Sequence, residues 1–264
     1  MADAVEQAWC HAWGALGFDG ATLVDDTPHC LRVLTPGTSD LLMNAVLRFR
    51  QTAPVQLADL EAVIAPFRAA RRPMQWWVRT GAEPADLRTQ LDALGMCPWG
   101  NPVGMALPLA GWQPQPLPPD VAVWPVATPE DGATALHIIC QVFGMAPTPM
   151  RRWCVANPHF TVYLATVGGV PAGALVRQIR DGVAGFFHVA TLPHFRRRGV
   201  AAALMAQALC HAQMQGAHVA ALTASPMAEA LYQRLGFIPC CTFDLWMPSA
   251  SLMADLTGFS AHAG

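Results

Sequence analysis

The sequence has few charged residues for its length. Of its 264 residues only 13% are charged, and 16 Lys and Arg residues stand against 18 Asp and Glu residues. A chain with so little net charge has no overall field that would attract nucleic acid or an anionic membrane. We therefore expect small molecules or another protein as partners, and no binding to nucleic acid or to a membrane.

Long apolar runs and metal-binding cysteine patterns are also missing. No stretch approaches the ~20 apolar residues that span a bilayer, and the acidic start is unlike a signal peptide. The eight cysteines form no Cys-x-x-Cys pair and no Cys/His ligand spacing, so we interpret them as reduced, mostly buried thiols. We expect a cytoplasmic protein without a metal site. The cysteines are Cys10, Cys30, Cys97, Cys140, Cys154, Cys210, Cys240 and Cys241.

What the chain does have is enough apolar sequence for two domains. It is 53% hydrophobic, and its length favours two domains of ~100–150 residues. The segment Leu107–Asp120 is rich in proline, which favours extended backbone and predicts a semi-rigid linker. We place the boundary near residue 115 and expect domains at 1–115 and 116–250, followed by a C-terminal tail at 251–264.

Alternating strand and helix patterns run through the second half. Three strands follow one another across the turn-forming pairs Gly168-Gly169 and Asp181-Gly182. The order of elements predicts an α/β (α+β) fold with a mixed, mostly antiparallel central sheet flanked by helices. The predicted strands are 121–126, 160–167, 172–180, 184–191, 219–223 and 237–247, and the predicted helices are 129–142, 148–156, 200–215 and 227–235.

The first half is less explicit but repeats one feature of the second. A predicted helix at 87–94 passes through Leu94-Gly95-Met96 into a strand ending near 105–107, much as Leu235-Gly236-Phe237 follows a helix later. This is either a weak internal repeat or a junction that any α/β protein contains.

The stretch from Val189 to Leu204 carries the clearest chemical signal. Three arginines, Arg196, Arg197 and Arg198, stand where a helix begins and where its dipole disfavours cations. Free amides of a first helical turn bind anions, and the small residues Gly199 and Ala201 allow a phosphate to approach the main chain. A solvated basic helix start is the alternative, but the preceding strand and proline and the downstream pattern favour a pyrophosphate cradle.

Two motifs together give a resemblance. Pro-x-Phe-Arg-Arg-Arg-Gly-Val-Ala, followed about thirty residues later by Ala-Leu-Tyr-x-x-Leu-Gly-Phe, resembles the GNAT superfamily of N-acetyltransferases over roughly residues 121–247. The family's loop motif, Arg/Gln-x-x-Gly-x-Gly/Ala, falls on Arg196, Gly199 and Ala201. The resemblance implies a GNAT fold here, preceded by a smaller, degenerate GNAT-like α/β domain of the kind found in tandem GNAT proteins.

The resemblance also implies roles for individual residues. Loop amides would hold the coenzyme A pyrophosphate, the end of the preceding strand would pair with the pantetheine arm, and Tyr232 would protonate the departing thiolate. Ser225 stands where many relatives contact coenzyme A through an asparagine, although a helix N-cap is the alternative. The implied acetyl-CoA contacts are Val189, Ala190, Thr191, Arg196, Arg197, Arg198, Gly199, Val200, Ala201, Ala202 and Ser225.

The general base is the weakest part of the pattern. Many relatives use a glutamate on a central strand, but neither 184–191 nor 219–223 carries a carboxylate. His188 is the titratable residue on these strands and has a suitable ordinary pKa. It is otherwise a core histidine, in which case a water chain or Glu229 would serve as base. For Tyr232, the alternative to catalysis is an ordinary aromatic residue on a helix face.

The acceptor is not specified by these motifs. His137, Phe143, Trp153 and His159 lie in or just beyond the first two helices, which in the family line the acceptor site, although core packing also explains the aromatic residues. No Arg-x-x-Gly-x-Gly/Ala pattern precedes residue 196, so we expect one coenzyme A site per chain. The N-terminal half is then a wall or lid of the acceptor pocket, or a stabilising partner.

The sequence thus predicts an enzyme that transfers acetyl from acetyl-CoA to a primary amine of a small molecule, an amino acid or a peptide. The alternative is a CoA-binding regulatory or sensor module without efficient turnover. A monomer and a homodimer are both compatible with the sequence.

Overall fold

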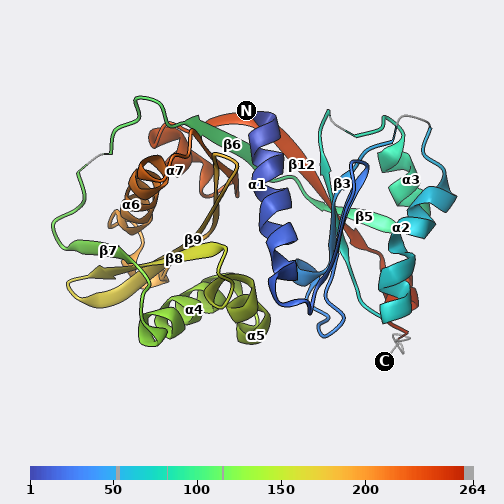
Figure 1. Cartoon of the computed structure of the whole chain (residues 1–264), viewed down its shortest axis with the longest axis horizontal. Coiled ribbons are helices and arrows are strands. Elements are labelled where there is room, and N and C mark those ends of the chain that lie inside the picture. Colours follow the sequence, from blue (N-terminus) through green and yellow to red (C-terminus); the bar gives the residue numbers. More distant parts are fainter. Residues whose placement is uncertain (52–53, 82, 115, 259–264) are drawn as a thin grey trace. The chain divides into compact units, whose positions relative to one another are not determined.

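The computed structural model describes residues 1–51, 54–81, 83–114 and 116–258 (Figure 1). These residues form two compact units. Unit 1 combines Met1–Ala12 with Gly104–Cys240, and unit 2 combines Trp13–Val103 with the chain from Cys241 onward. Each unit therefore takes residues from both halves of the sequence.

The predicted domain boundary at residue 115 lies outside the described residues, as does the end of the predicted tail, 259–264. The division into domains at 1–115 and 116–250 stays a prediction. The first part of the predicted tail is a helix, α8, whose N-cap Ser249 accepts a hydrogen bond from the Leu252 amide at 3.3 Å.

A mixed sheet forms the centre of unit 1, with the strand order β6-β11-β10-β9-β8-β7. The pairs β7–β8, β8–β9 and β9–β10 are antiparallel, whereas β10 and β11 are parallel. The predicted mixed, mostly antiparallel sheet flanked by helices is confirmed. The strands are β6 Val103–Pro108, β7 Val121–Pro125, β8 Phe160–Val167, β9 Val170–Arg180, β10 Val183–Thr191 and β11 Val219–Ala224.

Helices cover both faces of this sheet. In Figure 1, α6 lies above β8 and β9, and α4 lies below them. The start of α4 follows from local sequence, because Thr128 accepts a hydrogen bond from the Asp131 amide at 3.1 Å and Pro129 occupies the first turn. The helices of unit 1 are α1 Ala2–Gly14 (to Ala12), α4 Pro129–Phe143, α5 Pro147–Met150, α6 Val200–Met214 and α7 Glu229–Arg234.

One predicted helix has a different form. Residues 148–156 were expected to be a single helix, but α5 ends at Met150 and a π-helix, η3 (Arg151–Val155), continues it. A π-helix has a wider turn, and such turns occur often at functional sites. The wider turn carries the fully buried ring of Trp153.

Unit 2 is a smaller α/β unit. Its strands follow the order β1-β2-β3-β4-β12, and β5 also pairs with β12. Its apolar core includes residues as far apart as Leu34 and Leu256, so the last helix completes it. Its elements are η1 Ala15–Asp19, β1 Leu23–Asp26, β2 Cys30–Leu34, η2 Leu41–Met43, β3 Ala45–Phe49, α2 Leu57–Ala70, β4 Gln75–Arg79, α3 Leu87–Leu94, β5 Met96–Gly100, β12 Ile238–Pro248 (from Cys241) and α8 Ala250–Thr257.

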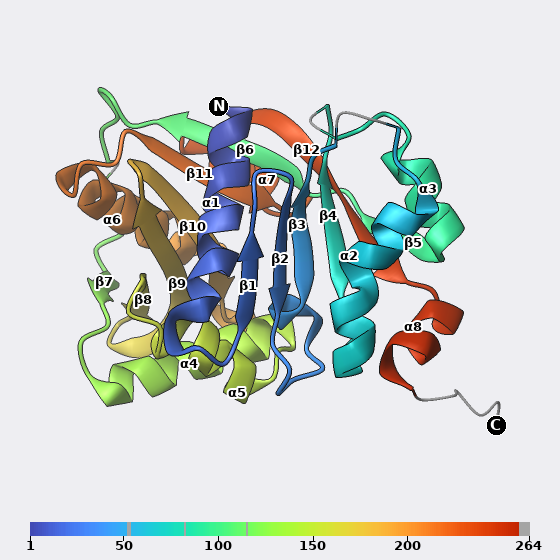
Figure 2. The same ribbon diagram turned by 45° about the vertical axis from the view of Figure 1, so that its right-hand side comes forward.

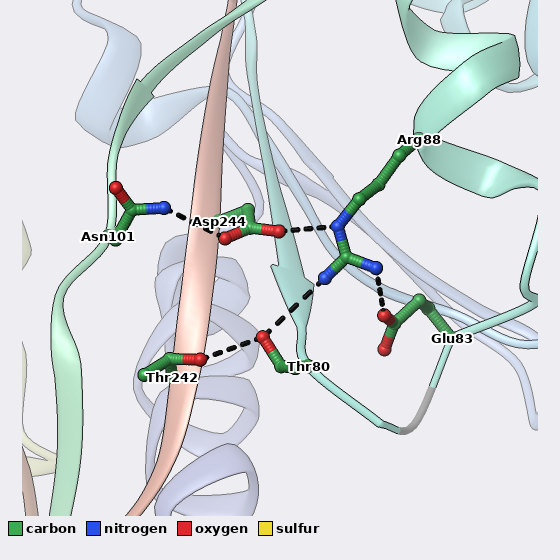
Figure 3. A network of polar contacts seen from close by, with 6 residues as sticks. All are labelled: Thr80, Glu83, Arg88, Asn101, Thr242 and Asp244. Atoms are coloured by element: carbon green, nitrogen blue, oxygen red, sulfur yellow. Dashed lines mark hydrogen bonds and ion pairs between the residues drawn. The ribbon is translucent and has the colours of Figure 1, made fainter.

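A polar network ties β12 to the rest of unit 2 (Figure 3). Asp244 accepts hydrogen bonds from Arg88 Nε at 2.5 Å and from Asn101 Nδ2 at 2.9 Å. Arg88 also pairs with Glu83, and Thr80 and Thr242 share a hydrogen bond of 2.8 Å. Because the Asp244 side chain is only 18% exposed, solvent screens these contacts weakly.

We predict that Asp244→Ala lowers the free energy of unfolding by about 1–3 kcal/mol, since Arg88 and Asn101 lose a charged acceptor. Urea denaturation followed by circular dichroism measures the change. Asp255→Ala is the matched control, because Asp255 also pairs with an arginine, Arg68, but is 51% exposed and should contribute less than about 1 kcal/mol. Equal effects of the two substitutions would show that the network does not anchor β12.

Candidate functional site

The parallel strands β10 and β11 pair over only three residues each. Val183–Gly185 pairs with Val219–Ala221, after which β10 continues to Thr191 and β11 to Ala224. No described strand pairs with the side of β10 that faces away from β9 beyond Gly185. An exposed strand edge offers main-chain donors and acceptors to an extended ligand. This edge contains the predicted contacts Val189, Ala190 and Thr191.

A bulge interrupts β10 just before these residues. Its register with β9 shifts between Phe187 and Ala190, and His188 has a φ of +49°. Successive side chains of a regular strand point to opposite faces. Here Phe187 and His188 both contact the ring of Trp153, at centroid distances of 5.4 and 4.8 Å. The bulge thus brings two adjacent side chains to the same face of the sheet.

After β10 the chain bends into α6. A short 3-10 helix, η4 (Pro193–Phe195), is followed by two left-handed residues, Arg197 with a φ of +64° and Gly199 with a φ of +78°. Glycine is required at 199, because a Cβ there would lie 2.7 Å from Pro118 Cγ. In the described part of the chain, the six amides of Arg197–Ala202 donate no hydrogen bond to the protein. The predicted cradle therefore has its donors available.

The three arginines of the cradle have different surroundings. Arg198 Nη2 lies 2.7 Å from Asp120 Oδ2, and its guanidinium carbon lies 5.7 Å from the Phe195 ring centroid. The side chains of Arg196 and Arg197 are exposed and have no partner among the described residues. These two cations are therefore available to an anionic ligand at the start of α6.

Tyr232 lies on α7, which follows β11. Its side chain is only 6% exposed and packs against Phe237 at a centroid distance of 5.8 Å. Burial raises its pKa to about 12, so the phenol stays protonated at neutral pH. Its hydroxyl makes no hydrogen bond within the described chain, so it is free to donate one to a ligand.

His188 lies among aromatic rings rather than charges. Its ring centroid is 5.4 Å from that of Phe143, which ends α4, and its Nε2 is buried without a hydrogen-bond partner. Burial lowers its pKa to about 4, and no charged side chain contributes to the shift. The imidazole is therefore neutral at pH 7, but it is a weaker base than an ordinary histidine.

The remaining predicted residues are more loosely placed. Ser225 is exposed, and its carbonyl accepts hydrogen bonds from the amides of Ala228 and Glu229. The N-cap interpretation of Ser225 is wrong, because α7 begins at Glu229 with Ala228 in the cap position. Glu229 Oε1 accepts a hydrogen bond from Gln233 Nε2 at 3.1 Å on the same helix.

Sequence reasoning missed contributions from distant segments. Trp9 of α1 packs edge-on against Phe187 at 5.7 Å, and α1 lies against β10 (Figure 2). Asp120 lies in the proline-rich segment that was expected to be a linker, yet its carboxylate forms an ion pair with Arg198. Gly173 of β9 lies beside Ala190. The short motif gave no signal for any of these contacts. His137 and His159, noted as acceptor-side residues, are exposed.

Neither a metal-binding cluster nor a membrane-spanning helix occurs among the described residues. No three His, Cys, Asp or Glu side chains gather there in a way that would hold a metal ion. None of the helices there has the length and apolar character required to cross a bilayer.

Comparison with known proteins supports the family resemblance. Residues 158–239 match the family model described as an acetyltransferase (GNAT) domain. This segment contains the edge of β10, the cradle and Tyr232, and the resemblance to the GNAT superfamily is confirmed by this match. Members of this family use acetyl-CoA. Comparison with curated protein sequences gives no significant match.

Solved structures extend the likeness in fold to most of the chain. A GCN5-related N-acetyltransferase from Kribbella flavida aligns with a TM-score of 0.74 and 23% identity, covering 93% of this chain and 95% of that one. One from Sphaerobacter thermophilus has a TM-score of 0.61 and 18% identity, with coverages of 93% and 92%. A tandem GNAT protein from the clavulanic acid biosynthesis pathway has a TM-score of 0.56 and 13% identity, with coverages of 92% and 94%.

We predict that Gly173→Ala weakens both folding and coenzyme A binding. An added Cβ would lie 2.7 Å from the Ala190 carbonyl oxygen and 2.7 Å from Val200 Cγ1, so the end of β10 and the start of α6 must move. Overpacking of this kind lowers the free energy of unfolding by about 1–3 kcal/mol. Urea denaturation and calorimetric titration with coenzyme A measure the two effects. Gly100→Ala, in another strand but with no atom within 4 Å of the added Cβ, should change neither. A Gly173→Ala protein that behaves like Gly100→Ala would contradict this packing.

We also predict that His188 makes the protein less stable in acid. The folded-state pKa of about 4 lies below the ordinary value of 6.5, so unfolded chains bind a proton between these pH values and folded chains do not. Stability from the neutral imidazole is complete above pH 6.5 and decreases by up to about 3 kcal/mol as the pH falls to 4. The non-titrating His188→Asn protein, whose asparagine tolerates positive φ, should lose less stability over this range. Parallel pH dependences of the two proteins in urea denaturation would refute the prediction.

Proposed function

Starting from the GNAT match of residues 158–239, we propose that the protein transfers the acetyl group of acetyl-CoA to a primary amine. The observation that supports the proposal most is that two stretches of main chain without hydrogen-bond partners among the described residues follow one another in the sequence. The unpaired edge of β10 leads directly into the six unpaired amides of Arg197–Ala202. An extended ligand with a diphosphate at one end fits this arrangement.

Each part of this surface has a role in the proposed reaction. The amides of Arg197–Ala202 bind the diphosphate, assisted by the exposed side chains of Arg196 and Arg197. The main chain at Val189–Thr191 pairs with the pantetheine arm and donates a hydrogen bond to the thioester oxygen, on which negative charge develops. Acetyl-CoA supplies an activated acyl carbon. The amine nitrogen adds to this carbon to form the C–N bond, its proton passes to a base, and the C–S bond then breaks to release the thiolate of coenzyme A.

Tyr232 would stabilise the departing sulfur. A phenol with a pKa of about 12 is a weaker acid than a thiol, whose pKa is ≈ 8.5. Complete transfer of its proton is therefore unfavourable at rest. The hydroxyl contributes most as a hydrogen-bond donor while charge develops on sulfur, and the proton that the thiol finally carries comes from the amine or from solvent.

His188 remains our candidate for receiving the amine proton. Its low pKa makes it ineffective toward a free ammonium ion, whose pKa is about 10. The nitrogen becomes far more acidic once it has attacked the thioester, and at that stage a neutral imidazole is a sufficient acceptor. Water and Glu229 are the alternatives.

A second function is a CoA-binding regulatory or sensor module without efficient turnover. The low pKa of His188 and the absence of carboxylates on β10 and β11 favour it. The unpaired hydroxyl of Tyr232 favours an enzyme, because binding alone does not need a proton donor. Release of free thiol from acetyl-CoA in the presence of a panel of amines distinguishes the two functions.

Other parts of the proposal come from the sequence. A cytoplasmic location, the absence of nucleic acid and membrane partners, one coenzyme A site per chain, and a monomeric or homodimeric state stay predictions. Contact between Ser225 and coenzyme A, and descent of the N-terminal half from a GNAT domain, do so as well.

We predict that Tyr232→Phe lowers kcat by about 10²- to 10³-fold, as loss of one donor to a developing negative charge does, while the Kd for coenzyme A changes by less than about twofold. Phenylalanine keeps the packing against Phe237 and removes only the hydroxyl. Thiol release measures kcat, and calorimetry measures Kd.

Tyr163→Phe is the matched control, since Tyr163 is the only other tyrosine. Its hydroxyl is hydrogen-bonded to His211 Nδ1 at 3.1 Å, in the core of unit 1. Its loss should reduce stability and leave the chemical step intact. Unchanged turnover in Tyr232→Phe would remove the assigned role from Tyr232.

A further inference from the structure

Two aromatic rings flank His188 at the bulge of β10. The centroid of Trp153 lies 4.8 Å and that of Phe143 lies 5.4 Å from the imidazole centroid, both in edge-to-face orientations. Phe143 comes from the end of α4, and Trp153 comes from the π-helix η3. Three separate elements therefore direct aromatic groups to the place where β10 would present an acyl group.

The two rings differ in exposure. Trp153 is fully buried, whereas Phe143 is 44% exposed although it is a large apolar side chain. Phe160 and Phe187 pack against Trp153 at ring-centroid distances of 4.7 and 5.4 Å, so Trp153 belongs to the aromatic core. Phe143 is not needed to fill that core, and its exposed ring extends an apolar surface from His188 toward solvent.

The surroundings of His188 lack charge and leave a polar atom unsatisfied. Nε2 is buried and makes no hydrogen bond, which is unfavourable for a polar group. Burial alone accounts for its low pKa, so neither a carboxylate nor a cation acts on the ring. Among the described residues, no charged side chain acts on the His188 ring and would thereby be placed to pair with a ligand carboxylate, whereas an amino group offers Nε2 a hydrogen-bond donor.

We propose that Phe143, Trp153 and His188 form an acceptor subsite for a primary amine borne on a flat apolar group, with no carboxylate beside the amine. This inference rests on the proposed function, and it narrows the acceptor from amines in general to arylalkylamines. The flat group packs against the Phe143 ring, and the amino nitrogen lies by His188. An amino acid is a poor acceptor because its carboxylate would be desolvated without a partner.

Such a subsite also helps the amine to lose its proton. Removing an ammonium group from water without giving it a carboxylate lowers its pKa, as burial does for His188. The exposed ring of Phe143 still attracts the cation as it enters, because the face of an aromatic ring carries negative electrostatic potential. The missing glutamate is thereby replaced, in part, by desolvation of the acceptor.

Three matched amines test the proposal with the full-length protein. They are 2-phenylethylamine, its saturated analogue 2-cyclohexylethylamine, and phenylalanine, which adds a carboxylate to the first. We expect kcat/KM for 2-phenylethylamine to exceed that of the cyclohexyl compound by about threefold to tenfold and that of phenylalanine by at least about tenfold. An equal or higher kcat/KM for phenylalanine would overturn the proposal.

Phe143→Leu tests the ring itself, since it keeps an apolar side chain at an exposed position. We expect KM for 2-phenylethylamine to rise by about threefold to tenfold with an unchanged Kd for coenzyme A. Met214→Ala is the control, because Met214 is an 83% exposed apolar residue at the end of α6, and it should alter neither value. An unchanged KM in Phe143→Leu would contradict the subsite.

Failure of the proposed function has a different signature. If coenzyme A binds but no amine causes release of thiol, the transferase assignment fails. The amine subsite is then tested by itself, by calorimetric titration of 2-phenylethylamine into the CoA-loaded protein. Binding that Phe143→Leu weakens supports the subsite. Absence of binding to the unsubstituted protein refutes it.

Discussion

The short parallel pairing of β10 with β11 is the constraint on which the site depends. After three paired residues on each strand, the two strands no longer share hydrogen bonds, and the main chain of β10 keeps an open edge. β11 leads to α7 and Tyr232, while β10 leads to the amides at the start of α6. The point where the two strands separate therefore leaves the open edge of β10 on the one side and leads through β11 to the helix of Tyr232 on the other.

Left-handed residues occur at both ends of this edge. His188 and Arg197 have positive φ values, each of which costs about 1–3 kcal/mol for a residue other than glycine. At His188 the strained backbone turns two adjacent side chains toward Trp153. At Arg197 it turns the chain so that successive amides point outward before the helix begins. Two of the four described non-glycine residues with positive φ therefore lie at the site assigned to ligand binding, and the other two, Arg71 and Asp181, lie at a helix end and in a hairpin turn.

The sequence predicted those elements that short-range patterns specify. The helix starting at Val200, the strand ending at Thr191 and the amides around Gly199 follow from local residue types, and the structure has them. The bulge at His188 and the π-helix around Trp153 could not be predicted, because they depend on packing between segments distant in sequence. Predicted as one regular strand, 184–191 would place Phe187 and His188 on opposite faces.

The histidine shows the same limit in its chemistry. From the ordinary pKa of histidine, the sequence predicted His188 as a general base. In the structure its ring contacts the rings of Phe143 and Trp153, and Phe187 packs against the same tryptophan. Burial among rings is a tertiary property, and the sequence near residue 188 does not reveal it. The proline-rich segment shows the same limit. Its composition predicted a linker, but did not predict that Pro118 and Asp120 would lie next to Gly199 and Arg198 of the cradle.

The exchange of terminal segments between the two units affects how the chain is made. Unit 1 uses Met1–Ala12 but ends only at Cys240, and unit 2 begins at Trp13 but needs Leu252 and Leu256 for its core. During synthesis on the ribosome, the core of unit 1 is not complete before Cys240 has emerged, and the core of unit 2 is not complete before Leu256 has emerged. The first helix therefore lacks the contact between Trp9 and Phe187 until β10, which lies far along the chain, has been translated. Folding that begins so late leaves apolar surface exposed for longer, which increases the demand for chaperones.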